Sequence, residues 1–183
     1  MIQPQNITEY YINMLPLGGN VIDATAGNGF DTLKLCRGVG EKGKVYAFDI
    51  QKSALSETER KLIEQGFSNA TLICDSHSEL DKYVTEPVDG VVFNLGYLPG
   101  GDHSLQTKSE TTIEAIKKSL ILLKNTGFIS VTVYYGKNSG TEEKKGVMEF
   151  LKTLDYKKYT VLTHEFHNRP NNPPITVIIT KNA

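Results

Sequence analysis

The feature that most constrains this chain is a regular alternation of short apolar runs with longer helical patterns. From Asn20 onward, runs rich in Val, Ile and Phe are bounded by Gly, Asp or Asn and are separated by segments with apolar residues at helical spacing. Parallel strands need long crossover connections, which are usually helices, so this order predicts an α/β fold with helices on both faces of a parallel sheet. The expected strands span residues 20–24, 44–48, 70–74, 90–93 and 127–134.

The segments between these strands and the last two apolar runs of the chain extend this prediction. Two last apolar runs enclose the stretch from Asn168 to Pro174, which is dense in turn residues and therefore predicts a closing hairpin. Together these segments predict one seven-stranded, mostly parallel sheet with an antiparallel last strand, as in a Rossmann-like fold. The expected helices cover residues 7–15, 31–36, 53–65, 111–123 and 142–154, a less regular link covers 76–83, and the hairpin strands cover 156–164 and 175–181.

This single sheet uses the whole length of the chain. With 183 residues and 39% hydrophobic content, the chain is expected to form one domain, residues 1–183, around one core, with none left for a separate substrate domain. The net charge of −1 excludes an overall cationic field, but the charge is uneven. It is −5 up to Val91 and +4 after it, so the second part of the chain can present a local basic face.

The loop after the first expected strand predicts a nucleotide site. Gly27 and Gly29 allow a tight turn and a close approach of a ligand, and the helix that follows offers free amides. Asp49 ends the second expected strand, where a carboxylate can accept hydrogen bonds from both hydroxyls of a ribose. A dinucleotide fingerprint would need Gly or Ala at the position of Thr32, so NAD is the weaker interpretation.

Acids at three successive strand ends favour a different cofactor. Asp23, Asp49 and Asp75 suit a ligand with an ammonium, a ribose and an adenine, which is the pattern of S-adenosylmethionine-binding class I methyltransferases. In that interpretation Asp23 helps to hold the methionine ammonium, directly or through water, and Asp75 lies near the adenine. The alternative is that these acids are ordinary helix caps.

The loop after the fourth expected strand, residues 94–103, would face this cofactor. Its shape is similar to the Asn-Pro-Pro-Tyr loop of amine-directed methyltransferases, in which an amide oxygen accepts a hydrogen bond from the target nitrogen. We therefore expect Asn94 to orient the nucleophile and Tyr97 to pack against or orient the substrate. The alternative is a Gly/Pro-rich loop that only turns the chain.

Further polar residues are weaker candidates for the substrate side. Asp102 and His103 are near enough in sequence to accept the proton that an alkylammonium must lose, although loss to solvent before binding would serve equally. Tyr134 and Tyr135 could stack on a base, and Arg169 could meet a phosphate. His164 and His167 have no third ligand in view, so no metal site is predicted.

Taken together, these loops resemble a known family of small bacterial methyltransferases. The resemblance spans nearly the whole chain and is most specific in the Asn94 loop; these proteins, long labelled rRNA methylases, methylate the aminomethyl group of 5-aminomethyl-2-thiouridine at the tRNA wobble position. The motifs that carry it are Asp23-Ala24-Thr25 with Gly27-Asn28-Gly29, Asp31-Thr32, Phe48-Asp49-Ile50-Gln51, Asp75-Ser76-His77, residues 94–102, Thr111-Thr112 and the run ending at Pro174.

The resemblance implies S-adenosylmethionine as donor, the anticodon arm of tRNA as substrate and 5-methylaminomethyl-2-thiouridine as product. Thr25 stands where the general methyltransferase motif has Gly, and His103 stands where many relatives have Lys. The residues expected in the cofactor site are Asp23, Thr25, Gly27, Asn28, Gly29, Asp31, Thr32, Asp49, Gln51, Asp75, Ser76, His77 and Asn94.

Alternatives to this function are an rRNA or small-molecule amine methyltransferase and a non-catalytic S-adenosylmethionine-binding module. Neither DNA nor a membrane is an expected partner, and a homodimer is a possible assembly. Cys36 and Cys74 are expected to be buried free thiols. Since the N-terminus lacks a leader pattern and no long apolar run occurs, we expect a cytoplasmic protein.

Overall fold

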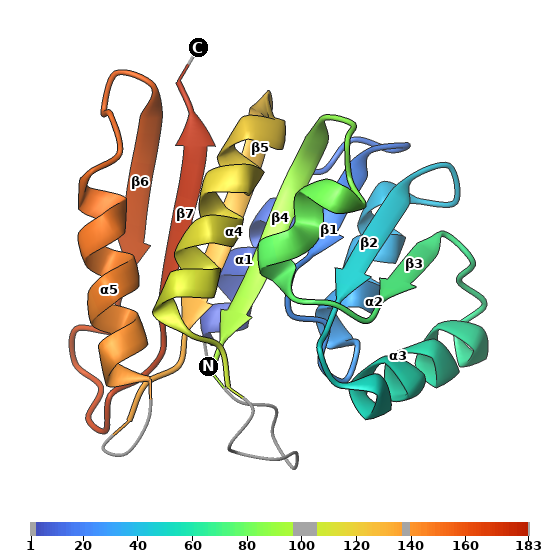
Figure 1. Cartoon of the computed structure of the whole chain (residues 1–183), viewed down its shortest axis with the longest axis horizontal. Coiled ribbons are helices and arrows are strands. Elements are labelled where there is room, and N and C mark those ends of the chain that lie inside the picture. Colours follow the sequence, from blue (N-terminus) through green and yellow to red (C-terminus); the bar gives the residue numbers. More distant parts are fainter. Residues whose placement is uncertain (1–2, 97–105, 137–139, 183) are drawn as a thin grey trace.

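A computed structural model describes residues 3–96, 106–136 and 140–182 of the chain. Seven strands form a single sheet in the order β3-β2-β1-β4-β5-β7-β6 (Figure 1). The strands are β1 (Asn20–Asp23), β2 (Lys44–Phe48), β3 (Ala70–Ile73), β4 (Val88–Leu95), β5 (Leu123–Val133), β6 (Tyr159–His164) and β7 (Ile175–Lys181). The helices are α1 (Pro4–Ile12), α2 (Phe30–Val39), α3 (Lys52–Glu64), the 3₁₀ helix η1 (His77–Lys82), α4 (Ser109–Leu122) and α5 (Thr141–Lys152).

The predicted topology is confirmed. Strands β1 to β5 pair in parallel, and β7 pairs antiparallel with both β5 and β6, so the closing hairpin supplies the antiparallel last strand. The turn between β6 and β7 contains Asn171 and Asn172 at positive φ, a conformation that Asn tolerates better than most residues. The sheet order reverses between β1 and β4, which opens a crevice at the carboxyl ends of these strands.

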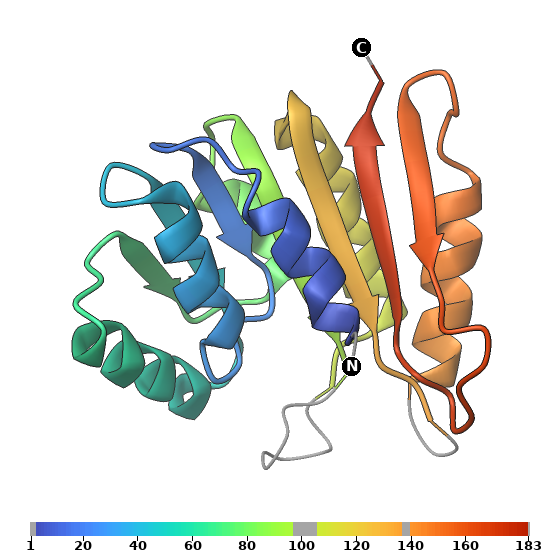
Figure 2. The same cartoon turned by 180° about the vertical axis from the view of Figure 1, so that it is seen from behind.

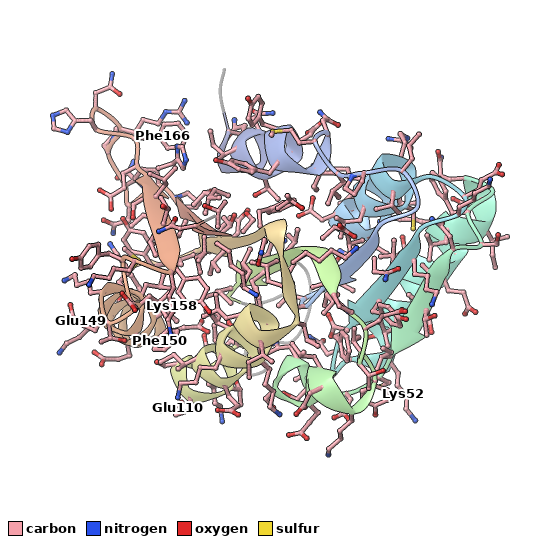
Figure 3. All side chains as sticks on the ribbon, turned by 90° about the horizontal axis from the view of Figure 1, so that it is seen from above. Lys52, Glu110, Glu149, Phe150, Lys158 and Phe166 are labelled. Atoms are coloured by element: carbon pink, nitrogen blue, oxygen red, sulfur yellow. The ribbon has the colours of Figure 1, made fainter. Side chains whose placement is uncertain are left out.

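Helices cover both faces of the sheet. The view from behind shows α1 and α2 on the face opposite to η1, α4 and α5 (Figure 2). From above, α4 with Glu110 and α5 with Glu149 and Phe150 lie together on one side, whereas α1 lies on the other (Figure 3). The larger apolar cluster fills the face under η1, α4 and α5 and includes Phe48, Phe93 and Ile116; the cluster under α1 to α3 includes Ile12 and Leu35. Burial of both faces explains why the central strands are almost wholly apolar.

Some boundaries and one burial prediction differ from expectation. The first helix was expected at 7–15 but ends at Ile12, after which the Met14 and Leu15 amides donate three residues back, to the Tyr11 and Ile12 carbonyls; it starts earlier because Pro4 suits a first turn. Strand β5 starts at Leu123, since its first residue pairs with Val88 across an irregularity in register. Cys36 is buried as expected, but Cys74 is exposed, because the chain leaves the sheet at Ile73.

Candidate functional site

A cleft of about 1030 Å³ lies at the carboxyl ends of the parallel strands. Its walls come from the loops after β1, β2, β3 and β4 and from the segments that follow β5 and precede β7. The lining residues are Ala24, Thr25, Ala26, Gly27, Asn28, Phe30, Asp31, Lys34, Phe48, Asp49, Ile50, Gln51, Asp75, Ser76, His77, Asn94, Gly96, Gln106, Thr107, Lys108, Thr111, Tyr134, Tyr135, Gly136, Asn172 and Pro174.

The loop after β1 makes the tight turn that the sequence predicts. Gly27 and Gly29 have φ of 50° and 80°, values that glycine adopts without strain, and a side chain at Gly29 would also meet Thr58 at 2.8 Å. The Gly27 amide donates to Asp49 Oδ2 at 2.9 Å, and the Gln51 amide donates to Asp49 Oδ1 at 2.8 Å. These two bonds fix the carboxylate of Asp49 at the cleft wall and join the first two loops.

Asp23 does not line the cleft. Its side chain is fully buried, accepts a hydrogen bond from the Thr32 hydroxyl at 2.6 Å and contacts the Thr25 amide at 3.3 Å. Burial raises the pKa of Asp23 to about 7, and the negative charge of Asp31 contributes to the same shift. Asp23 and Thr32 therefore support the first loop from beneath, and Asp31 is the acid on this side that lines the cleft.

The raised pKa of Asp23 predicts a pH-dependent stability. Between about pH 4 and pH 7 the unfolded chain loses the proton while the folded protein retains it, so the folded state becomes relatively less stable as the pH rises. In Asp23→Asn this contribution is absent. We expect the free energy of unfolding of the wild type, minus that of the variant, to fall by roughly 3 kcal/mol between pH 4.5 and pH 8. Urea unfolding at pH 4.5 and pH 8 measures it; parallel pH profiles would contradict the assignment.

The end of β4 is tied to the first loop by two hydrogen bonds of Asn94. Its backbone amide donates to Thr25 Oγ1 at 2.7 Å, and its side-chain Nδ2 donates to Asp31 Oδ2 at 2.9 Å. Because a carboxylate only accepts hydrogen bonds, the contact with Asp31 determines which end of the amide is the nitrogen. Among the residues that the structure describes, nothing donates to Asn94 Oδ1, which leaves this acceptor for a ligand in the cleft. Lys34 pairs with Asp31 at 3.2 Å.

The wall after β3 combines an anchored acid with a neutral histidine. Asp75 accepts hydrogen bonds from Tyr83 Oη at 2.8 Å and from the Ser76 amide at 2.7 Å, which lower the pKa of its carboxyl. His77 packs edge-on against Phe93 and is 8% exposed. Burial lowers the pKa of His77 to about 4, so its ring is neutral at pH 7. Its Nε2 atom is buried without a hydrogen-bond partner in the described part of the chain.

The opposite wall carries aromatic and basic side chains. Tyr134 and Tyr135 follow β5 and line the cleft together with Lys108, at the start of α4. The Lys144 ammonium lies 3.6 Å from the centre of the Tyr135 ring, a cation–π contact that holds the ring in place. Arg169 does not line the cleft. Its guanidinium stacks at 3.7 Å on Phe166, which lies on the connection between β6 and β7 and is labelled in Figure 3.

The structure thus brings most of the predicted site residues into one cleft. Gly29, like Asp23 and Thr32, supports it without lining it, and Tyr97, Asp102 and His103 lie outside the described residues. Sequence reasoning missed several lining residues. Phe30 is 65% exposed with Lys61 over its ring at 3.9 Å, and Thr107 joins the far wall. An aromatic residue at the start of a helix that follows a glycine-rich loop is a sequence signal that pointed to Phe30. No sequence signal pointed to Thr107.

The described residues include neither a cluster of metal-ligating side chains nor a membrane-spanning helix. No group of three or more His, Cys, Asp or Glu residues there is arranged to hold a metal ion. None of the helices in residues 3–96, 106–136 and 140–182 is both long and apolar enough to cross a membrane.

Comparison with known proteins assigns the family. Residues 45–180 match a family model described as "Putative rRNA methylase". The chain belongs to this family. A solved structure from Clostridium thermocellum, described as a "putative rRNA-methylase", is 47% identical with a TM-score of 0.97, and the match covers 100% of this chain and 99% of that one.

Two further similar proteins are relevant to the chemistry of the site. A protein from Streptococcus mutans described as a "putative methyltransferase", solved in complex with SAH, is 40% identical with a TM-score of 0.92 over 100% of this chain and 99% of that chain. A chloroplastic tRNA (mnm(5)s(2)U34)-methyltransferase from Arabidopsis thaliana is 40% identical over 168 residues, which are 85% of this chain and 61% of that protein. The chain therefore spans about three fifths of the length of this plant relative. The fold is that of a Rossmann-like class I methyltransferase, as the sequence predicts.

Proposed function

We propose that this protein is an S-adenosylmethionine-dependent tRNA methyltransferase. It methylates the primary amine of 5-aminomethyl-2-thiouridine at the wobble position and produces 5-methylaminomethyl-2-thiouridine. The observation that carries the proposal is the orientation of Asn94: Asp31 holds its Nδ2, so Oδ1 is the end available to an N–H group in the cleft. The likeness to the plant tRNA methyltransferase supports the choice of substrate.

The residues of the cleft fit the cofactor. Asp49 is anchored where a carboxylate can accept from ribose hydroxyls, and Asp31 offers a negative charge to the methionine ammonium. Ile50, 55% exposed at the cleft wall, and Asp75 with Ser76 suit an adenine ring and its polar edge. SAH bound to the Streptococcus mutans relative, the demethylated form of this cofactor, supports the assignment.

The cofactor, when bound, supplies a methyl group that is activated by its attachment to a sulfonium. The protein must hold a neutral amine so that its lone pair faces this methyl, since a protonated amine has no electron pair to form the new N–C bond. Asn94 Oδ1 accepts one N–H of the amine and so restricts its rotation. The substrate amine first releases its proton to solvent, and after the transfer the methylated nitrogen carries the positive charge as a secondary ammonium, which stays protonated near pH 7. No covalent bond to the protein is needed.

The far wall of the cleft suits an RNA substrate. Tyr135 offers an aromatic face to a base, and its contact with Lys144 restricts the ring before a substrate arrives. Lys108 and Lys144 place positive charge on the half of the chain that is net basic, where a phosphate backbone would lie. The acidic half of the chain carries the proposed cofactor contacts. This division matches a protein that binds a small cofactor on one side and the anticodon arm on the other.

Methyl transfer from labelled S-adenosylmethionine tests the proposal. The protein is incubated with tRNA that carries 5-aminomethyl-2-thiouridine, with the same tRNA lacking the aminomethyl group, with rRNA and with a small alkylamine. We expect label only in the aminomethylated tRNA. Label in rRNA or in the small amine would identify one of those substrates instead. Binding of the cofactor without transfer to any substrate would overturn the proposal and indicate a non-catalytic binding protein.

A narrower prediction concerns Tyr135. If its ring stacks on a base, Tyr135→Ala should raise the KM for tRNA by about tenfold, because a base–aromatic stack contributes about 1–3 kcal/mol. Tyr135→Phe should retain nearly wild-type KM. Tyr156→Ala is the matched control, since Tyr156 is 79% exposed and does not line the cleft. Steady-state kinetics with tRNA as the varied substrate decide; an unchanged KM in Tyr135→Ala would remove this residue from the RNA interface.

A further inference from the structure

Glu143 is a buried acid that the proposed chemistry does not use. It lies in the first turn of α5, is 6% exposed and does not line the cleft. Its Oε2 accepts a hydrogen bond from the Thr107 hydroxyl at 2.6 Å, and its Oε1 accepts one from the Thr112 hydroxyl at 2.8 Å. No cation pairs with it within the described residues. Burial of a carboxylate costs free energy. The presence of this buried acid, held by two hydroxyl donors, therefore needs a physical explanation.

The bond to Thr107 connects Glu143 to the end of β4. The Gly96 amide donates to Thr107 Oγ1 at 2.8 Å, and the Thr107 amide donates back to the Gly96 carbonyl at 3.0 Å. Thr107 Oγ1 can accept from Gly96 while its own proton points to Glu143, so the carboxylate determines the direction of this hydroxyl. Gly96 has φ of 140°, which favours glycine, and a side chain there would meet Tyr134 Cβ at 3.4 Å.

Three successive residues at the end of β4 are therefore each anchored to a different element. The Asn94 amide donates to Thr25 in the loop after β1, the Leu95 carbonyl accepts from the Tyr134 amide after β5, and Gly96 is held by Thr107. The first turns of α4 and α5 lie at the same edge of the sheet as the end of β4 (Figure 1). Contact between these helices is close, because a side chain at Gly146 would come within 2.0 Å of Ser109 Oγ.

From this network we infer that Glu143 is a positioning residue: through Thr107 and Gly96 it holds the end of β4 so that Asn94 meets the substrate amine in a fixed orientation. The same turn of α5 carries Lys144, which contacts Tyr135, so α5 sets both the amine-binding and the base-stacking walls. Only the predicted effect on kcat rests on the proposed function; the hydrogen-bonded connection from Glu143 to Gly96 does not. Burial raises the pKa of Glu143, in keeping with a carboxylate held by hydroxyl groups instead of by a cation.

Four variants test the role of Glu143. Thr107→Val removes the bridging hydroxyl at nearly constant shape, and Glu143→Ala removes its acceptor. Each should lower kcat for methyl transfer by about 10- to 100-fold, the effect expected from a small misplacement of reacting groups, and leave S-adenosylmethionine affinity within twofold. Glu143→Gln should retain most of the activity, since its amide oxygen still accepts from Thr107. Thr112→Val is the matched control, because it removes the other bond to the same carboxylate without touching Gly96.

The combination Thr107→Val with Glu143→Ala should be no worse than the more impaired single variant, because both changes break one connection. Equal losses of kcat in Thr107→Val and Thr112→Val, or additive losses in the double variant, would mean that Glu143 only stabilises the packing of α4 on α5 and would overturn the inference.

The Gly96 amide provides a readout that does not depend on activity. In ¹⁵N-glycine-labelled protein, its exchange with solvent should accelerate in Thr107→Val and Glu143→Ala but not in Thr112→Val. If the wild type methylates no RNA yet Gly96 behaves in this way, the proposed function fails and the hydrogen-bonded connection stands. If Gly96 exchange is unchanged in all variants, the connection is wrong even in an active enzyme.

Discussion

Asn94→Ala is expected to lower kcat for tRNA methylation by on the order of 100- to 1,000-fold. The side chain supplies an acceptor at the cleft wall whose direction is set by another residue, since Asp31 holds the opposite end of the amide. Without it, the amine keeps its affinity for the cleft through the rest of the RNA but loses its alignment with the methyl group. The loss should therefore fall on kcat and not on KM, as expected when an interaction serves the transition state.

Three measurements accompany this prediction. S-adenosylmethionine affinity, measured by calorimetry, should change little, because the backbone bond from residue 94 to Thr25 does not depend on the side chain. Asn125→Ala, an exposed asparagine far from the cleft lining, is the matched control and should be fully active. Wild-type turnover in Asn94→Ala would refute the role of the carboxamide.

Asp49→Ala is expected to weaken S-adenosylmethionine binding by at least about 100-fold. Two hydrogen bonds that the carboxylate accepts from ribose hydroxyls contribute about 1.5–3 kcal/mol each, and their loss alone accounts for this factor. The carboxylate also holds the Gly27 and Gln51 amides at 2.9 and 2.8 Å, so its removal loosens the loop against which the cofactor lies. Both effects weaken the binding of S-adenosylmethionine.

Calorimetry with S-adenosylmethionine and with SAH measures the Asp49 effect directly and needs no RNA. Asp49→Asn separates the two contributions, because the amide retains one acceptor for a backbone amide but loses the charge. Glu41→Ala, which removes an exposed acid away from the cleft, should bind the cofactor normally. An unchanged dissociation constant in Asp49→Ala would exclude this carboxylate from the cofactor site.

Local patterns were sufficient for the order of elements and for the loops that form the cleft. Apolar runs and helical spacing repeat within a few residues, so they predicted the alternation of strands and helices and the hairpin that places β7 antiparallel. Boundaries were less predictable. Strand β5 extends back to Leu123 because it pairs with β4, and Cys74 is exposed because the sheet ends one residue before it; both depend on neighbours distant in sequence.

The acids at the strand ends show the same difference between what sequence spacing predicts and what tertiary contacts decide. Sequence spacing placed Asp23, Asp49 and Asp75 at strand ends, but it did not distinguish a side chain that faces the cleft from one that faces the core. Asp23 faces Thr32 beneath the loop, and Asp31, the second residue of α2, reaches Asn94 instead. Only the packing of α2 against the sheet decides this, because the direction of a side chain at a strand end follows the twist and the contacts of that strand.

By itself the sequence determined that this chain folds as a Rossmann-like sheet with a glycine-rich loop, an acid at Asp49 and an asparagine at the end of β4. The orientation of that asparagine was decided by tertiary structure, through a contact with Asp31 across 63 residues, and so was the place of Glu143, through a contact with Thr107 across 36 residues. Hydrogen bonds between distant residues leave no periodic pattern in a single sequence, whereas burial along strands and helices does. The chemistry of this cleft therefore depends on contacts that exist only after the sheet has assembled.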